Sequence, residues 1–179
     1  MQKGLTALFI CIFALFSCSE EQDFGQFDDL SVTPTLASSI LYLESGEDII
    51  NLAGSGNFYS EVFTFEAFNE AFVSERILDG TITYQVENTT SKEIAISIDF
   101  LDDGGNVLDT EAFVIQPDPA PFLVREIAYG NGGRSLDILR NTTEIRVGGQ
   151  NLGDDTSTST QPNPKIILKS SAAFRLRLQ

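Results

Sequence analysis

The chain has 179 residues with 26 acidic and 11 basic side chains, so its formal net charge at pH 7 is −15. A field of this sign repels phosphate backbones and excludes nucleic-acid binding through a basic patch. There is no histidine or tryptophan, which excludes Ser-His-Asp and Cys-His catalysis and the common zinc and haem sites. We therefore expect no catalytic residues, no metal ligands and no cofactor, with Ca²⁺ as the one ion left open.

Residues 1–17 have the pattern of a secretory signal peptide. Lys3 is the only charged residue there, and an uncharged, mostly apolar run extends from Leu5 to Phe16. A membrane-spanning helix needs ~20 apolar residues, so this run is too short to remain as an anchor. The competing interpretation is a buried helix or strand of the fold. We expect the segment to be removed from the mature protein.

The end of this segment resembles the lipobox of bacterial lipoproteins, whose cysteine receives diacylglycerol. Leu15, Ser17 and Cys18 match that motif, whereas Phe16 stands where the family has a smaller residue. The resemblance implies that Cys18 is lipidated and becomes the first residue of the mature chain, which leaves no cysteine for a disulfide. The alternative is ordinary signal-peptidase cleavage after Ser19, with Ser17 and Ser19 as the two small residues.

An acidic segment follows Cys18, and it resembles the export signal that many Bacteroidota lipoproteins carry. The resemblance implies a protein held by its lipid in the outer membrane and exposed at the cell surface, with the periplasmic face as the alternative. Its composition also fits a solvated tether. We expect a signal peptide over 1–17, an acidic tether over 18–33 and a folded domain over 34–179. The residues of the export signal are Ser19, Glu20, Glu21 and Asp23.

The folded domain is predicted to be all-β. Apolar and polar residues alternate in Thr81–Glu87 and Ile94–Phe100, which is typical of half-buried antiparallel strands. Turn-forming residues 102–106 lead into Val107–Ile115, and we expect these three strands to form a meander. Together with the remaining strands they predict a single antiparallel sandwich of about seven to nine strands. The remaining strands are Ala37–Leu43, Phe58–Phe65, Leu123–Tyr129, Thr143–Val147 and Lys165–Leu178.

Two short helices and two connections interrupt the strand pattern. Helices are predicted over Asn69–Arg76 and Ser135–Leu139, each at an open end of the sandwich, and the alternative for residues 63–73 is one continued strand. The proline-rich residues 117–121 suit a crossover between sheets. The polar residues 150–164 form either a mobile hairpin tip or a binding loop.

The segment 82–116 resembles the opening hairpin of immunoglobulin-like sandwiches, and in particular the late-embryogenesis-abundant LEA14-like group. In that group a strand ending in Val-x-Asn, here Val86 to Asn88, leads through a turn into an alternating strand, here from Ile94. The resemblance implies an immunoglobulin-like sandwich. It implies no catalytic site, because the group is not defined by one.

Carboxylate pairs are the remaining source of catalytic chemistry, because glycoside hydrolysis can use two acids alone. Most candidates lie in turns, where Asp is expected to bond its own backbone. Residues 102–106 and 153–155 place oxygen ligands near glycines without the ligand order of a Ca²⁺ loop, and residues 130–134 lack the lysine and hydroxyl of a phosphate loop. The candidate acids are Asp99, Asp102, Asp103, Asp154 and Asp155.

These features predict a non-catalytic surface lipoprotein that acts as an interaction or assembly component of the outer membrane, with an envelope protein as partner. The alternative is a surface module that binds glycan or Ca²⁺. A carboxylate-only hydrolase is the third hypothesis, and it requires two acids that converge in a cleft.

Overall fold

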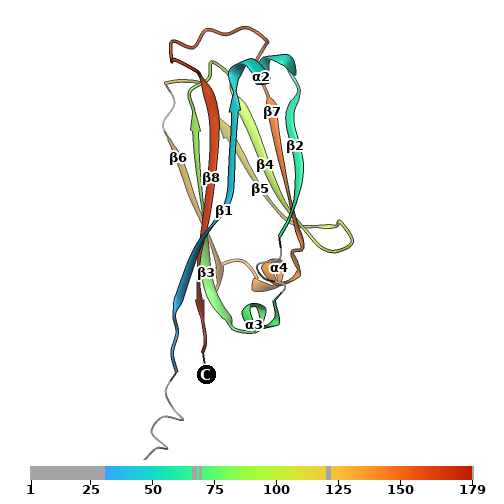
Figure 1. Ribbon diagram of the computed structural model, residues 1–179, viewed down its shortest axis with the longest axis vertical. Helices are drawn as coiled ribbons and strands as arrows, with labels where there is room; N and C mark the ends of the chain where they lie inside the picture. Colours follow the sequence, from blue (N-terminus) through green and yellow to red (C-terminus); the bar gives the residue numbers. More distant parts are fainter. Residues whose placement is uncertain (1–30, 66–67, 69, 120–121, 179) are drawn as a thin grey trace, which may run out of the picture. The chain divides into compact units, whose positions relative to one another are not determined.

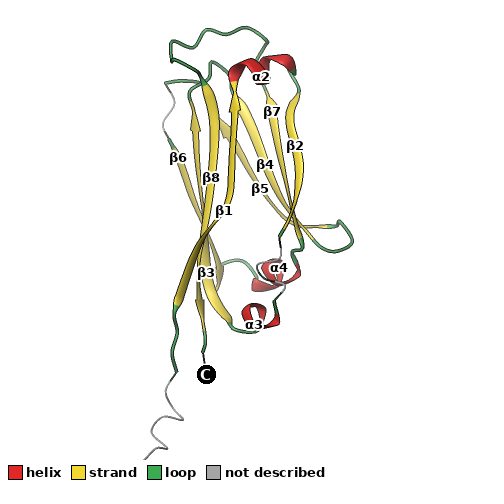
Figure 2. Ribbon diagram, viewed as in Figure 1, coloured by secondary structure: helices red, strands yellow, loops and turns green. Residues whose placement is uncertain are grey.

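The described part of the chain contains eight strands and three short helices in the computed structural model (Figures 1 and 2). The structure describes residues 31–65, 68, 70–119 and 122–178. The predicted signal peptide, the lipobox and the export signal lie outside these residues. The elements are β1 (Thr35–Gly46), α2 (Glu47–Leu52), β2 (Asn57–Thr64), α3 (Ala71–Ser74), β3 (Ile77–Asn88), β4 (Ile94–Leu101), β5 (Val107–Ile115), β6 (Leu123–Gly130), α4 (Leu136–Asn141), β7 (Glu144–Asn151) and β8 (Lys165–Leu176).

The strands form two four-stranded antiparallel sheets that face each other. One sheet has the order β1-β8-β3-β6 and the other has the order β2-β7-β4-β5. The predicted all-β antiparallel sandwich with short helices is therefore confirmed. The strand order is that of a double-sheet jelly roll. None of the helices in the described ranges is long and apolar enough to cross a membrane.

The predicted meander is wrong, because β3 lies in one sheet whereas β4 and β5 lie in the other. Of the three strands in the predicted meander, β4 and β5 pair with each other, with Ile94 opposite Ile115. The physical reason lies in the buried Asn88. Its Nδ2 donates to the carbonyls of Lys92 (2.7 Å) and Gln116 (3.0 Å), which turns the chain across to the opposite sheet. The hairpin implied by the immunoglobulin-like and LEA14-like resemblance is corrected in the same way.

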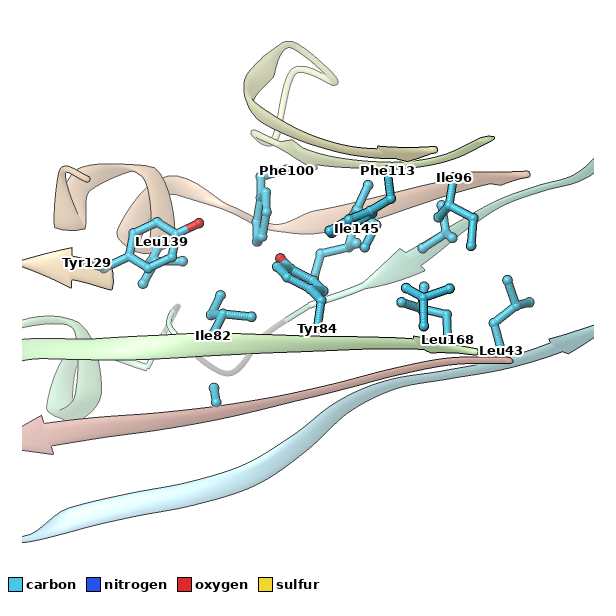
Figure 3. Packing of buried hydrophobic residues seen from close by; sticks show 14 of the residues in the cluster. Leu43, Ile82, Tyr84, Ile96, Phe100, Phe113, Tyr129, Leu139, Ile145 and Leu168 are labelled. Atoms are coloured by element: carbon cyan, nitrogen blue, oxygen red, sulfur yellow. The ribbon is translucent and has the colours of Figure 1, made fainter. Parts of the chain in front are cut away.

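The core is the set of inward-facing side chains that the alternation predicted. Tyr84 on β3 is 1% exposed and its ring packs against Phe113 on β5, with 5.4 Å between ring centroids. Figure 3 shows side chains of the two sheets meeting between the layers. Burying each large apolar side chain contributes roughly 1.5–3 kcal/mol. The other labelled members are Leu43, Ile82, Ile96, Phe100, Tyr129, Leu139, Ile145 and Leu168.

The helices lie at the two ends of the sandwich (Figure 2). In α4, the Ser135 Oγ accepts from the Asp137 N–H (3.1 Å) and Leu139 is fully buried. The helix predicted over Asn69–Arg76 is reduced to α3. The alternative continued strand over 63–73 is wrong, because β2 ends at Thr64. Sequence reasoning missed α2, because its six residues are too few to display a 3.6-residue repeat.

The connections behave partly as expected. β5 and β6 lie in opposite sheets, so the predicted crossover between them is confirmed. The loop between β7 and β8 is anchored along its length. The Leu152 N–H donates to the Glu93 carbonyl (2.9 Å) and the Ser159 Oγ to the Thr89 carbonyl (2.8 Å). The expectation of a mobile tip missed these bonds because their partners lie far away in the sequence.

Candidate ligand-binding face

The acids singled out from the sequence lie in three separate places. Asp102 closes its own turn by accepting from the N–H groups of Gly104 (2.9 Å) and Asn106 (2.8 Å). Asp99 accepts from Arg146 Nη2 at 2.7 Å on the outer face of its sheet. Within the ranges that the structure describes, no three acidic, His or Cys side chains form a group that could hold a metal ion.

Asp154 is held by the buried Lys92, whose Nζ lies 2.6 Å from its Oδ1. This hydrogen bond, together with those from the Thr156 side chain and N–H, keeps the pKa of Asp154 well below its usual range. The carboxylate is thereby fixed as the anchor of the loop that follows β7. Asp155 is exposed beside it.

One pair of converging carboxylates was missed by the sequence reasoning. Asp109 and Glu111 of β5 both form ion pairs with Arg134, and Arg125 Nη1 lies 3.7 Å from Glu111 Oε2. Glu111 is 2% exposed. Its position on the inward face of an alternating strand was the available signal. Because the two acids share an arginine, the arrangement balances their charge and links the β5 and β6 edges of the sandwich.

The outer face of the β1-β8-β3-β6 sheet carries a trough across its strands. Two neighbouring rows of side chains form its floor, and all of them except Glu126 are small. In the first row Ser39, Ser171, Thr83 and Glu126 lie side by side on the four strands. Because neighbouring strands are ~4.8 Å apart, this row spans about 14 Å. The second row consists of Ala37, Ala173, Thr81 and Ala128.

Larger side chains border the floor on both sides. On the side toward α2 the bordering row contains Tyr42, Lys169 and Gln85. On the other side Asp79 and Arg175 form an ion pair. The hollow beside Tyr42 has a volume of about 440 Å³, and the adjoining hollow over the alanine row has about 520 Å³. The two share Ser39, Thr83 and Ser171 in their linings.

The Tyr42 ring is the exposed aromatic group of this face, with 64% of its surface accessible. Its hydroxyl donates to Glu44 Oε2 (2.5 Å), and Lys165 Nζ donates to Glu44 Oε1 (2.8 Å). The hydrogen bond to Glu44 raises the pKa of Tyr42, so the phenol stays neutral at physiological pH. Two side chains therefore hold the ring at the edge of the trough. Among the described residues, the Lys169 ammonium makes no ion pair.

Comparisons with known proteins give solved structures of low sequence identity and with TM-scores below 0.5. No family model matches the chain, and no curated protein matches it. A protein from Parabacteroides distasonis is 12% identical, with 80% of this chain and 38% of that chain covered and a TM-score of 0.41. The VP2 subviral particle of infectious bursal disease virus is 9% identical, with coverage of 82% and 33% and a TM-score of 0.38. The protein of the disulfide-linked pili of Bacillus endospore appendages is 8% identical, with 81% of this chain and 91% of that chain covered and a TM-score of 0.36.

Proposed function

We propose that this protein is a non-catalytic surface module that binds a neutral polysaccharide along the trough of the β1-β8-β3-β6 sheet. The observation that carries the proposal is the trough itself, with a hydroxyl-lined floor beside the exposed ring of Tyr42. Sugar rings offer hydroxyl groups that donate and accept hydrogen bonds, and an apolar face that stacks on an aromatic ring. Ser39, Ser171 and Thr83 supply the first kind of partner, and Tyr42 supplies the second.

Charge favours a neutral ligand over an anionic one. The whole chain carries a formal charge of −15, which repels polyanions at long range. Within the trough, Lys169 and Glu126 have opposite charges and Arg175 is paired with Asp79. An uncharged chain can therefore lie across the strands without encountering a net field along the floor.

The module acts at the cell surface in this proposal, held in the outer membrane by lipid on Cys18. Support comes from the sequence, since Leu15, Ser17 and Cys18 match the lipobox pattern and an acidic tether follows. A second candidate function is docking of an envelope protein in an outer-membrane assembly. The exposed apolar side chains Val114, Phe122 and Val124 beside the β5–β6 crossover favour it.

The test measures binding of fluorescent galactomannan, xyloglucan and arabinoxylan to the full-length protein, both on intact cells and after purification in detergent. We expect at least one neutral polysaccharide to bind, and polygalacturonate to bind less. Tyr42→Ala should weaken binding roughly three- to tenfold through loss of stacking, and Thr83→Val should weaken it through loss of one hydroxyl. Phe122→Ala, which also removes an exposed aromatic ring, is the matched control and should bind normally.

The same experiment tests the tether. Cys18→Ala should bind polysaccharide normally when purified but should remove binding from intact cells. Equal binding by wild type, Tyr42→Ala and Thr83→Val would contradict the trough as the binding face. Partner crosslinking that is lost in Phe122→Ala and kept in Tyr42→Ala would instead favour the envelope-protein function.

A further inference from the structure

An apolar hollow of about 190 Å³ lies against the first half of β1. β1 is paired with β8 there, with Leu36 opposite Phe174, so both side chains point to the same face of the sheet. The opposite wall is formed by Phe68 of the connection that follows β2 and by Val73 of α3. The hollow exists because β2 ends at Thr64, and a connection rather than a strand faces this part of β1.

A second hollow, of about 320 Å³, continues the first one between the β1 and β2 edges of the two sheets. It is lined by Leu43 of β1, by Phe63 of β2 and by side chains of β7 and β8. Ile40 and Phe65 belong to the linings of both hollows, so the two adjoin end to end. We call them together the β1 slot. It follows β1 from Leu36 to Leu43, which at 3.3 Å per residue is a length of roughly 20 Å.

The β1 slot has the size and lining of a ligand site. Protein interiors are close-packed, and side chains around an empty apolar space lose dispersion contacts. A cavity of about 150 Å³ lined by Leu, Ile and Phe is enough to bind benzene, and the slot is larger. Because its volume is spread over its length, the slot is narrow and fits a linear hydrocarbon chain better than a ring system. One end is open, since 56% of the Leu36 surface is exposed.

Positive charge lies near the open end. Arg76 and Arg177 form no ion pair with any residue that the structure describes. The Arg177 N–H donates to the Arg76 carbonyl (2.9 Å), and the Arg76 N–H donates to the carbonyl of Val73, which lines the slot (3.0 Å). Arg177 directly follows Leu176, another lining residue. In a chain of charge −15, two such cations favour a ligand with an anionic head group.

We infer that the β1 slot binds a long-chain fatty acid, with its acyl chain between the sheets and its carboxylate at the open end beside Arg76 and Arg177. Burial of the chain in the slot replaces empty apolar space with dispersion contacts and removes the hydrocarbon from water. The inference does not rest on the proposed polysaccharide binding, because the trough lies on the outer face of the β1-β8-β3-β6 sheet. Ser39 and Tyr42 line both spaces, so the variants that test the slot leave them unchanged.

The test is displacement of the fluorescent fatty acid cis-parinarate from the full-length protein in CHAPS, a detergent without an alkyl chain. Palmitate should displace the probe. From octanoate upward, the affinity of saturated fatty acids should rise roughly two- to fourfold with each CH₂ until the slot is filled. Naphthoate, an anion with a compact ring system, should displace the probe weakly. Failure of the probe to bind, or equal displacement by naphthoate and palmitate, would overturn the inference.

Variants locate the ligand. Leu36→Trp narrows the open end and Ala172→Leu fills the lining of the first hollow, so each should weaken palmitate binding at least fivefold. Leu52→Trp adds the same ring at an exposed position of α2 and is the matched control, which should bind normally. If Ala172→Leu does not fold, Leu36→Trp decides, because its position is exposed. Equal binding by Leu36→Trp and wild type would place the ligand outside the slot.

The head group is tested separately. Arg76→Gln should weaken binding of palmitate more than binding of hexadecanol, which has the same chain without the charge. Equal losses for the two ligands would contradict the placement of the carboxylate.

Discussion

At the scale of single residues, the most consequential side chain is a carboxylate that points toward the core instead of the solvent. Glu111 occupies an inward position of β5 opposite the buried Ile98, and only 2% of its surface is exposed. Its ion pairs with Arg134 and Arg125 are what make that position tolerable. A buried acid of this kind stabilises the fold only while its partners remain in place.

We predict that Glu111→Ala lowers the free energy of unfolding by ~2–4 kcal/mol, because Arg134 and Arg125 lose a buried partner. Chemical denaturation followed by circular dichroism measures this change. The control is Asp103→Ala, which removes an exposed acid in a turn and should change stability by less than ~0.5 kcal/mol. Equal effects of the two substitutions would show that the Glu111 ion pairs contribute nothing.

Residue-level function was the part least predictable from the sequence. The candidate acids, such as Asp102, hold local structure, whereas Glu111 was not recognised. Glu111 acquires its significance from Arg134, which is distant in the chain. Proximity of that kind has no local pattern. The trough beside Tyr42 was not predicted for the same reason, because its rows form only when β1, β8, β3 and β6 are paired.

At the scale of elements, β3 approaches β8 so closely that it needs a residue without a side chain. A Cβ on Gly80 would lie 2.6 Å from the Ala173 carbonyl oxygen and would also collide with the Phe174 ring. Phe174 is not free to move, because its ring packs edge-on against Phe68 with 4.9 Å between centroids. The glycine thus allows an aromatic side chain to close this end of the core.

Gly80→Ala should therefore destabilise the protein by ~1–3 kcal/mol through overpacking. Combining it with Phe174→Leu, which makes room for the new methyl group, should cost less than the sum of the two single changes. A double-mutant cycle by urea denaturation measures the coupling. Strict additivity would mean that the close approach of Phe174 does not explain the glycine.

The strands were predictable, but their pairing was not. Period-two alternation located β3, β4 and β5 correctly, because each strand has one face in the core. Alternation does not encode which strand lies beside which. The assumption that neighbours in sequence pair failed at Asn88, whose side chain bonds carbonyls of the following connection and of Gln116 beyond β5.

At the scale of the whole molecule, two tyrosines buried between the sheets make the free energy of unfolding decrease at alkaline pH. Burial raises the pKa of Tyr84, and it raises the pKa of Tyr129 to about 12. The ordinary value is 10.0, so ionisation favours the unfolded chain. The stabilising contribution is complete below pH 10 and is lost as the pH rises toward 12.

We predict that the free energy of unfolding falls between pH 10 and pH 12, by up to about 2–3 kcal/mol from Tyr129 alone. Urea denaturation at several pH values measures the fall, and absorbance at 295 nm follows the phenolate. Tyr129→Phe should flatten the profile. It should change stability little at pH 7, because the buried hydroxyl has no hydrogen-bond partner among the residues that the structure describes. An unchanged profile in Tyr129→Phe would contradict this assignment.

The register shift between Ser39 and Leu41 in β1 has a consequence for crowded surroundings. β1 is an edge strand, and the free backbone groups along such an edge can recruit a strand from another molecule. The shift interrupts that row, so a foreign strand cannot extend the ladder continuously along β1. If the module is anchored at the cell surface as we propose, it meets copies of itself often, and this irregularity discourages the edge-to-edge aggregation that would otherwise follow.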